Sequence, residues 1–267
     1  MNILEFKNRK TGDKSERVRK LSLITCYDYT SACLASQTSI DALLVGDSLA
    51  MTMYGHSSTL PATLELMAAH TAAVVRGAGD KMVIADLPFL SFRKSLSDNV
   101  NAVALLMQAG AHAVKLEGAA GNCELVQHLV QSGVPVMGHL GLTPQSVNQL
   151  GGYKVQGREA SAAQAITKAA LDLEAAGCFS VVLECVPSAL AREITANLMI
   201  PTIGIGAGPD TDGQILVWQD LLGLNTDFTP KFVRTYANGA DVIRAAIDSY
   251  VHDVREQTFP SPKESYE

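Results

Sequence analysis

Short apolar runs alternate with helix-like stretches along nearly the whole of this 267-residue chain. The runs are rich in aliphatic and β-branched residues and are bounded by glycine or polar residues, which is typical of buried parallel strands. We predict strands at Leu21–Cys26, Ala42–Gly46, Met82–Asp86, Ala113–Glu117, Pro135–His139, Ser180–Glu184, Thr202–Ile205 and Ile215–Trp218. Between them we predict helices over Thr63–Arg76, Asp98–Ala109, Asn122–Gln131, Ser161–Ala176 and Ser188–Asn197.

This alternation predicts an α/β fold, a single (β/α)8 TIM barrel. About eight strand–helix units in roughly 250 residues match the size of such a barrel. A doubly wound open sheet is the alternative, but no GxGxxG motif follows the first predicted strand, so a dinucleotide-binding fold lacks its best support. We expect one catalytic domain over residues 1–267, with a polar tail from about residue 256 lying outside the barrel.

Four of the predicted strands lead into an acidic residue, namely Asp47, Asp86, Glu117 and Glu184. The carboxyl ends of the strands are where a barrel carries its chemistry. Carboxylates gathered at one rim would form a site for a hard divalent cation, with one acid left over as a base. Simpler interpretations remain open: Asp47 could cap a helix, Asp86 could belong to the turn before Pro88, and Glu117 could form a structural ion pair.

Two basic side chains extend this pattern. Lys115 lies two residues before Glu117, so both side chains point to the same side of one strand. Inside a barrel they would be costly unless they were paired or bound to a ligand. His139 ends the fifth predicted strand and is either a structural residue or part of the binding site. The glycine-containing segment Gly151–Gly157 predicts a flexible loop, which we interpret as a lid.

Composition excludes several classes of protein. The formal net charge of -6 gives no basic surface for nucleic acid. No apolar run reaches the roughly 18 to 20 residues that a membrane span needs. Residues 1–20 are polar and charged and lack the apolar core of a signal peptide. The five cysteines are an odd number with no CxxC pair, which favours reduced thiols. We therefore expect a cytoplasmic enzyme that acts on small molecules.

Several longer segments of the chain resemble the ketopantoate hydroxymethyltransferase family. The resemblance covers about residues 20–250 and is carried by an ordered series of motifs: Val45–Ser48, Thr59–Glu65, Ala85–Phe89, Val114–Gly118, Val136–Ser146, Gly151–Arg158 and Gly204–Gly208 followed by Asp212–Gln214. Departures from the family pattern at Ala50, Phe92 and Ala119 remove no polar group that acts in the family.

The resemblance implies an enzyme of pantothenate (vitamin B5) and coenzyme A biosynthesis. Such an enzyme would transfer a hydroxymethyl group from 5,10-methylenetetrahydrofolate to 3-methyl-2-oxobutanoate, giving 2-dehydropantoate. One Mg²⁺ ion per subunit would be the cofactor, and methylenetetrahydrofolate would be the co-substrate. The family also implies a homo-oligomer, usually a homodecamer.

The same resemblance implies a role for each residue of the pattern. Asp47 and Asp86 would hold the metal, with Glu117 in or next to its shell. Glu184 would accept the proton from C3 of the keto acid. The residues implied for substrate binding are Asp47, Ser48, Asp86, Lys115 and His139. Elementary chemistry agrees, because a divalent cation on a keto oxygen stabilises the enolate and a base must lie near C3 without binding the metal.

Two alternative functions are compatible with such a barrel. The first is another magnesium-dependent α-keto-acid lyase, of the phosphoenolpyruvate-mutase or isocitrate-lyase type, which would share the enolate chemistry. The second is a non-catalytic barrel that binds a keto acid. The second is disfavoured because the charged residues of a complete site are all present.

Overall fold

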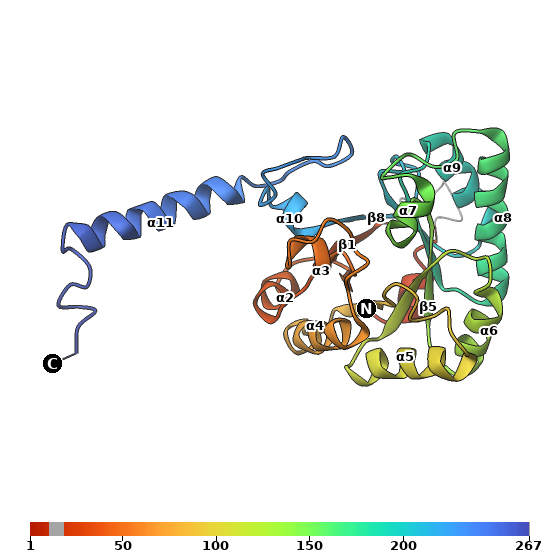
Figure 1. The fold of residues 1–267 in the computed structure, drawn as a ribbon, viewed down its shortest axis with the longest axis horizontal. Coiled ribbons are helices and arrows are strands. Elements are labelled where there is room, and N and C mark those ends of the chain that lie inside the picture. The colour runs from red at the N-terminus through yellow and green to blue at the C-terminus, as the bar shows by residue number, and fades with distance from the viewer. Residues whose placement is uncertain (11–18, 267) are drawn as a thin grey trace. The chain divides into compact units, whose positions relative to one another are not determined.

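The computed structural model describes residues 1–10 and 19–266; residues 11–18, in the polar N-terminal stretch, and residue 267 lie outside the described part. The chain forms two compact units, Met1–Leu216 and Val217–Glu267. All the labelled strands lie in the first unit (Figure 1). This unit ends at Leu216, earlier than the tail boundary near residue 256 that the sequence analysis expects.

The strands of the first unit form a closed parallel barrel, as predicted. Each strand pairs with the next along the chain, and β8 pairs with β1 to close the ring. The strands are β1 (Leu21–Thr25), β2 (Ala42–Val45), β3 (Met82–Asp86), β4 (Ala113–Glu117), β5 (Val136–Gly141), β6 (Ser180–Glu184), β7 (Thr202–Ile205) and β8 (Gly213–Leu216).

Helices cover the outside of this barrel (Figure 1). The longer ones are α2 (Tyr29–Ser36), α4 (Leu64–Gly77), α5 (Leu96–Gln108), α6 (Cys123–Gln131), α8 (Ala160–Ala176) and α9 (Ser188–Asn197). The short ones are α1 (Ile3–Lys7), α3 (Leu49–Thr52), the 3-10 turn η1 (Pro144–Ser146) and α7 (Val147–Leu150). Capping sets where several of them begin: the Thr63 hydroxyl accepts a hydrogen bond from Leu66 N at 3.2 Å at the start of α4.

Two predicted boundaries differ from the structure for identifiable reasons. Helix α5 begins at Leu96 because Ser95, rather than Asp98, is its N-cap and accepts a hydrogen bond from Asp98 N at 3.2 Å. Strand β8 begins at Gly213, whereas Ile215 was predicted as its first residue. A Cβ atom at Gly213 would lie 2.7 Å from the backbone oxygen of Leu21, so the pairing with β1 requires glycine, which is a weak strand signal by itself.

The barrel interior is a packed core. Leu44, Ile84 and Met137 from three strands belong to one buried cluster. Phe6 of α1 joins this cluster and meets Phe179 edge to face, with ring centroids 5.3 Å apart. Burying a side chain of this size contributes about 1.5–3 kcal/mol. Because the interior is filled by apolar side chains, the only places left for polar chemistry are the ends of the barrel.

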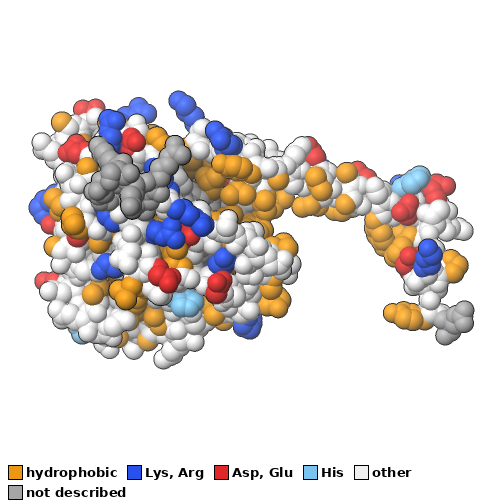
Figure 2. Space-filling view, turned by 180° about the vertical axis from the view of Figure 1, so that it is seen from behind, with side chains coloured by type: hydrophobic (Ala, Val, Ile, Leu, Met, Phe, Trp, Pro, Cys, Tyr) orange, Lys and Arg blue, Asp and Glu red, His pale blue; other side chains and the backbone are white. Residues whose placement is uncertain are grey.

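The second unit contains α10 (Trp218–Leu221) and α11 (Gly239–Arg255). None of the residues of α11 is buried, although Ile243, Ile247, Tyr250 and Val254 repeat at helical spacing. Figure 2 shows hydrophobic side chains along this helix. In the described part of the chain, no helix is both long enough and apolar enough to span a membrane.

Candidate active site

Strand register brings the predicted residues together at the carboxyl end of the barrel. Asp86 at the end of β3 is the register partner of Lys115 in β4, and Glu117 at the end of β4 is the partner of His139 in β5. Side chains of register partners on adjacent strands point to the same face. Glu184 ends the next strand, β6. The charged residues therefore line one rim, as the strand-end pattern predicts.

Asp47 and Asp86 form the most buried acidic pair of this rim. Asp47 is 4% exposed and Asp86 is 2% exposed. The backbone N of Asp47 donates to Asp86 Oδ2 at 3.2 Å. Burial, together with the charges of Asp86 and Glu117, raises the pKa of Asp47 to about 8. Burial also raises the pKa of Asp86, although Lys115 opposes this shift. Asp47 does not act as a side-chain helix cap, because α3 begins after Ser48 without a side-chain cap bond.

Lys115 is the cation nearest to this pair. Its Nζ lies 2.8 Å from Asp86 Oδ1 in a fully buried ion pair. Burial acts to lower the pKa of Lys115, but the surrounding carboxylates, led by Asp86, raise it above its ordinary value, so the ammonium group stays charged. Lys115 therefore occupies Asp86 Oδ1, and it balances part of the negative charge that gathers at this rim.

His139 joins two acidic groups across the rim. Its Nδ1 lies 3.4 Å from Glu117 Oε1, and its Nε2 lies 3.1 Å from Glu184 Oε2. Burial and the nearby Lys115 oppose a positive charge on the ring, but the contacts with Glu117 and Glu184 outweigh them and raise the pKa of His139 to about 9. The ring therefore carries a positive charge between the acids that end β4 and β6.

Glu184 is the most open acid of the cluster. Its side chain is 17% exposed, against 3% for Asp86 and 4% for Glu117. Its backbone is held firmly, because Leu142 N donates to Glu184 O at 2.8 Å. A Cβ atom at Gly141 would lie 2.2 Å from that same oxygen, so this close approach requires glycine. Glu184 thus presents an accessible carboxylate on a rigid backbone.

Sequence reasoning did not assign a role to two residues of this site, Gln145 and Tyr27. The Gln145 side chain donates to Asp47 Oδ2 at 2.8 Å. The Tyr27 hydroxyl lies 2.8 Å from the Ser48 hydroxyl, and burial raises the pKa of this phenol to about 12, so it stays protonated. Gln145 stands in the motif after His139, but a lone glutamine or tyrosine in a loop gives no signal of its partner.

The loop after α7 spans the same end of the barrel. Tyr153 OH donates to Met51 Sδ at 3.6 Å, which connects this loop to α3. The backbone N of Gln156 donates to Cys185 O at 2.8 Å, directly after Glu184. Burial raises the pKa of Tyr153, with smaller contributions from the charges of Asp47 and Glu184. The segment interpreted as a lid is therefore fastened at two points beside the site.

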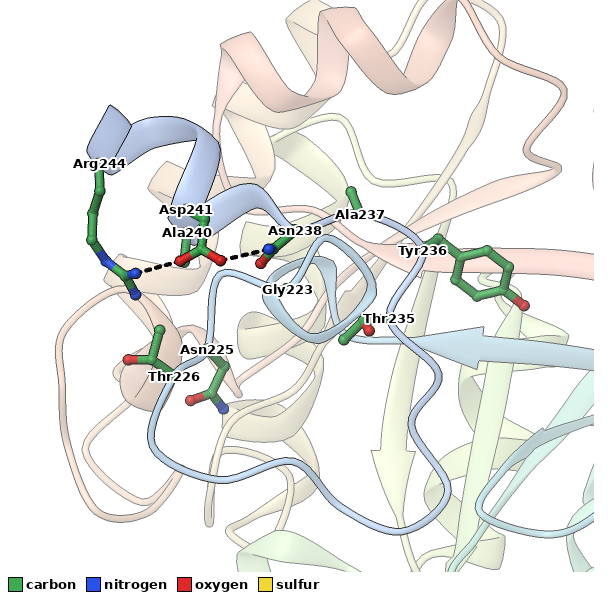
Figure 3. Close-up of a pocket in the computed structure, with 10 residues that line it drawn as sticks. All are labelled: Gly223, Asn225, Thr226, Thr235, Tyr236, Ala237, Asn238, Ala240, Asp241 and Arg244. Carbon is green, nitrogen blue, oxygen red and sulfur yellow. Dashed lines mark hydrogen bonds and ion pairs between the residues drawn. The ribbon is translucent and has the colours of Figure 1, made fainter. Parts of the chain in front are cut away.

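A cavity in the second unit has different surroundings (Figure 3). It has a volume of about 540 Å³ and is lined by residues between Gly223 and Arg244. Asp241 is hydrogen-bonded to Asn238 and ion-paired with Arg244 at its edge. None of the residues predicted for the site lines this cavity, so it is separate from the acidic rim.

The fold is that of a TIM barrel, and its candidate active site consists of carboxylates, a lysine and a histidine at the strand ends. The family model described as ketopantoate hydroxymethyltransferase matches residues 6–262. The chain therefore belongs to the ketopantoate hydroxymethyltransferase family, a family of transferases, which confirms the resemblance seen in the sequence.

Individual relatives agree with this membership. A protein of Bdellovibrio bacteriovorus named 3-methyl-2-oxobutanoate hydroxymethyltransferase is 65% identical over 99% of this chain and 98% of its own length. A protein of the same name from Coxiella burnetii is 56% identical over 97% and 96%. The solved structure of 2,3-dimethylmalate lyase, a PEP mutase/isocitrate lyase superfamily member, aligns with a TM-score of 0.61 at 15% identity, covering 99% of this chain and 91% of that one. At that identity the likeness concerns the fold alone.

Proposed function

We propose that this chain transfers a hydroxymethyl group from 5,10-methylenetetrahydrofolate to 3-methyl-2-oxobutanoate, giving 2-dehydropantoate for pantothenate and coenzyme A biosynthesis. The observation that carries the proposal is a continuous chain of contacts from Asp86 through Lys115 and His139 to Glu184. Lys115 Nζ lies 2.8 Å from Asp86 and 3.3 Å from His139 Nδ1, and His139 Nε2 lies 3.1 Å from Glu184. This chain separates an acidic pair suited to a cation from an accessible base.

The acidic pair fits a hard divalent cation such as Mg²⁺. Asp47 and Asp86 supply buried carboxylate oxygens, and the hydrogen bond from the backbone N of Asp47 to Asp86 Oδ2 keeps the two residues adjacent. No group of three or more His, Cys, Asp or Glu side chains is arranged as a metal site among the described residues. This agrees with Mg²⁺, which is held by one or two carboxylates together with substrate oxygens and water. We place one ion per subunit on Asp47 and Asp86, with Glu117 next to its shell.

The remaining polar side chains suit a short keto acid. Lys115 provides the buried positive charge that a substrate carboxylate requires, and Ser48 provides a hydroxyl oriented by Tyr27. When bound, the divalent cation would polarise the keto oxygen and so increase the acidity of the neighbouring C–H bond. His139 lies between Lys115 and Glu184 and would border the bound keto acid.

Glu184 then acts as the base. Its carboxylate takes the proton from C3, and the electron pair of the broken C–H bond forms the enolate. The enolate carbon forms a new bond to the methylene carbon of the folate as one of the two C–N bonds of that carbon breaks. One water then displaces the second nitrogen, which leaves as the tetrahydrofolate amine with a proton, and the water oxygen becomes the hydroxyl group. His139, held at 3.1 Å, keeps the Glu184 carboxylate oriented toward the substrate. The greater exposure of Glu184 gives the folate access to this end of the pocket.

The loop at Gly151–Gly157 is suited to exclude bulk water until the new C–C bond has formed. Its contacts with Met51 and Cys185 attach it on both sides of the rim. An activated methylene group is prone to hydrolysis, so a cover over the site would protect it. Tyr153, which is 50% exposed, presents its ring toward solvent and its hydroxyl toward the site.

A turnover assay tests the proposed function. Purified protein is mixed with Mg²⁺ and 3-methyl-2-oxobutanoate, with or without methylenetetrahydrofolate, and 2-dehydropantoate is measured by mass spectrometry. We expect product only when both the folate and the metal are present. Folate-independent cleavage of a C–C bond in related keto acids would instead show a lyase of the phosphoenolpyruvate-mutase or isocitrate-lyase type.

We further propose a homo-oligomer, a homodecamer, located in the cytoplasm. The exposed apolar residues of α11 support assembly, because Ile243, Ile247 and Tyr250 are each at least half exposed on one helix. All five cysteines are free thiols, which suits a reducing compartment. Sedimentation equilibrium of the full chain tests the assembly, and a monomeric mass at micromolar concentration would contradict it.

A further inference from the structure

The side chain and the backbone N of Gln145 together make hydrogen bonds to residues at the ends of three neighbouring strands of the acidic rim. It lies in η1, beyond the end of β5, and is 6% exposed. Its Nε2 donates to Asp47 Oδ2 at 2.8 Å and to Leu87 O at 2.9 Å. Its backbone N donates to Glu117 Oε2 at 3.0 Å. Gln145 thus contacts an acid that follows β2, the backbone after β3, and the acid that ends β4.

We infer that Gln145 is a positioning residue that holds the Asp47 carboxylate and Glu117 in the arrangement that the metal and the keto acid require. The inference rests on the proposed function and extends it to a residue that does not touch the reacting atoms. Both N–H groups of the side-chain amide donate hydrogen bonds, one to the Asp47 carboxylate and one to the main-chain oxygen of Leu87. The bond to Leu87 O fixes the amide plane, and the fixed amide in turn fixes the Asp47 carboxylate.

The chemistry of the position explains why an amide suits it. Asp47, Asp86 and Glu117 already crowd negative charge into a buried space, so a glutamate at 145 would add repulsion. Methionine has a similar length but no donor. Asparagine keeps the donors but is one methylene shorter, so it would not reach Asp47 from the same backbone position. Glutamine fits this position because it is neutral, carries two N–H donors and is long enough to reach Asp47.

The main test compares Gln145→Met with a matched control. Gln214, the second residue of β8, also donates both amide hydrogens internally, to Gly208 O at 2.9 Å and Thr211 Oγ1 at 2.8 Å, and it belongs to the opposite half of its strand. Gln214→Met therefore removes the same chemical groups away from the acidic rim. Mg²⁺ binding is measured by calorimetry with 3-methyl-2-oxobutanoate present, and kcat and KM are measured at saturating metal.

A hydrogen bond to a charged group is strong enough that its loss should change affinity or rate by roughly 10- to 100-fold. For Gln145→Met we expect Mg²⁺ affinity to fall by that factor and kcat to fall more than KM rises. We expect Gln214→Met to leave both unchanged. Wild-type Mg²⁺ affinity and kcat in Gln145→Met would overturn the inference, as would equal losses in both variants.

A second variant, Gln145→Glu, distinguishes an effect of side-chain positioning from an effect of net charge. It also tests the inference if Gln145→Met does not fold. Gln145→Glu keeps the shape of the side chain and adds a negative charge. Positioning predicts a lower kcat, because the donor to Asp47 is lost. Tighter Mg²⁺ binding with wild-type kcat would show that only net charge matters and would overturn the inference.

The two proposals fail in distinguishable ways. If the wild-type protein binds Mg²⁺ and the keto acid but forms no 2-dehydropantoate, the proposed function is wrong. The role of Gln145 is still judged by the Mg²⁺ affinity of its variants, which needs no turnover.

Discussion

Glu184 and His139 are in direct contact, with Glu184 Oε2 lying 3.1 Å from His139 Nε2. The other nitrogen of the same ring lies 3.4 Å from Glu117 Oε1. The proposed base is therefore not an isolated carboxylate at a strand end. It is one end of a row of charged side chains that reaches the acidic pair, and its orientation depends on the ring beside it.

Glu184→Gln should abolish proton abstraction while leaving binding nearly intact. The amide keeps the size of the side chain but cannot accept the proton from C3. Exchange of this proton with deuterated solvent, followed by NMR without folate, should slow by roughly 100-fold or more. The exposed Glu193→Gln serves as the control. Exchange at the wild-type rate in Glu184→Gln would remove this residue as the base.

Asp86→Ala should weaken Mg²⁺ binding by roughly 10-fold or more, because it removes one of the two buried carboxylates proposed to hold the ion. It also leaves Lys115 buried without its partner, which costs on the order of 3–5 kcal/mol of stability. Asp86→Asn keeps more of the packing and should show the same loss of affinity. Calorimetry measures the binding, and Asp172→Ala, on the exposed side of α8, is the control. An unchanged affinity in both Asp86 variants would refute the ligand role.

Mg²⁺ binding should release a proton near neutral pH. In the metal-free protein the pKa of Asp47 is raised to about 8, chiefly by burial, so its carboxyl is mostly protonated at pH 7. A bound cation favours the ionised form, so about one proton should leave per ion at about pH 7, and affinity should rise with pH until about pH 8. Calorimetry in buffers with different ionisation enthalpies measures the release. Binding without proton release at pH 7 would contradict this assignment.

His139→Asn should flatten the pH dependence of stability in the metal-free protein. The pKa of His139 is raised from 6.5 to about 9, because its contacts with Glu117 and Glu184 outweigh burial. The folded state then binds the extra proton, so this contribution is fully present below about pH 6.5 and is lost as pH rises through about 9. Its size is on the order of 3 kcal/mol.

Chemical denaturation in the presence of a chelator measures this effect. The stability gap between wild type and His139→Asn should be widest near pH 6 and should narrow as pH rises through about 9. His252→Asn, on the exposed helix α11, is the control for a histidine without buried partners. A gap that stays constant across this range would mean that His139 is not charged in the folded protein.

Tyr153→Ala should impair closure of the site more than Tyr153→Phe. Phenylalanine keeps the ring and loses only the weak contact of the hydroxyl with Met51 Sδ, so kcat should change by less than about 3-fold. Alanine removes the ring as well, and productive transfer should fall relative to C3 proton exchange, because water reaches the activated methylene group. The ratio of product formed to folate consumed reports this loss. An unchanged ratio in Tyr153→Ala would exclude a covering role.

Much of the fold could be predicted because its signals are local. Each buried strand is a short aliphatic run, and each longer helix of the barrel unit except α2 was predicted to within a few residues. The start of β8 could not be predicted from local sequence, because a tertiary contact requires glycine there. The backbone of β1 leaves no room for a side chain at Gly213. From the sequence we predict no helix over residues 239–255, where the structure has the exposed helix α11.

Sequence by itself determined that the chemistry lies at strand ends, since an acid after an apolar run is a local pattern, and its motifs determined the family. Tertiary structure decided which charges meet. Lys115 pairs with Asp86 of the neighbouring strand rather than with Glu117 of its own strand. Gln145 reaches Asp47 across 98 residues of chain. These contacts depend on strand register and on closure of the barrel, which bring segments that are distant in the sequence together by packing. Local propensities cannot predict them, because they act only between residues that are close in the sequence.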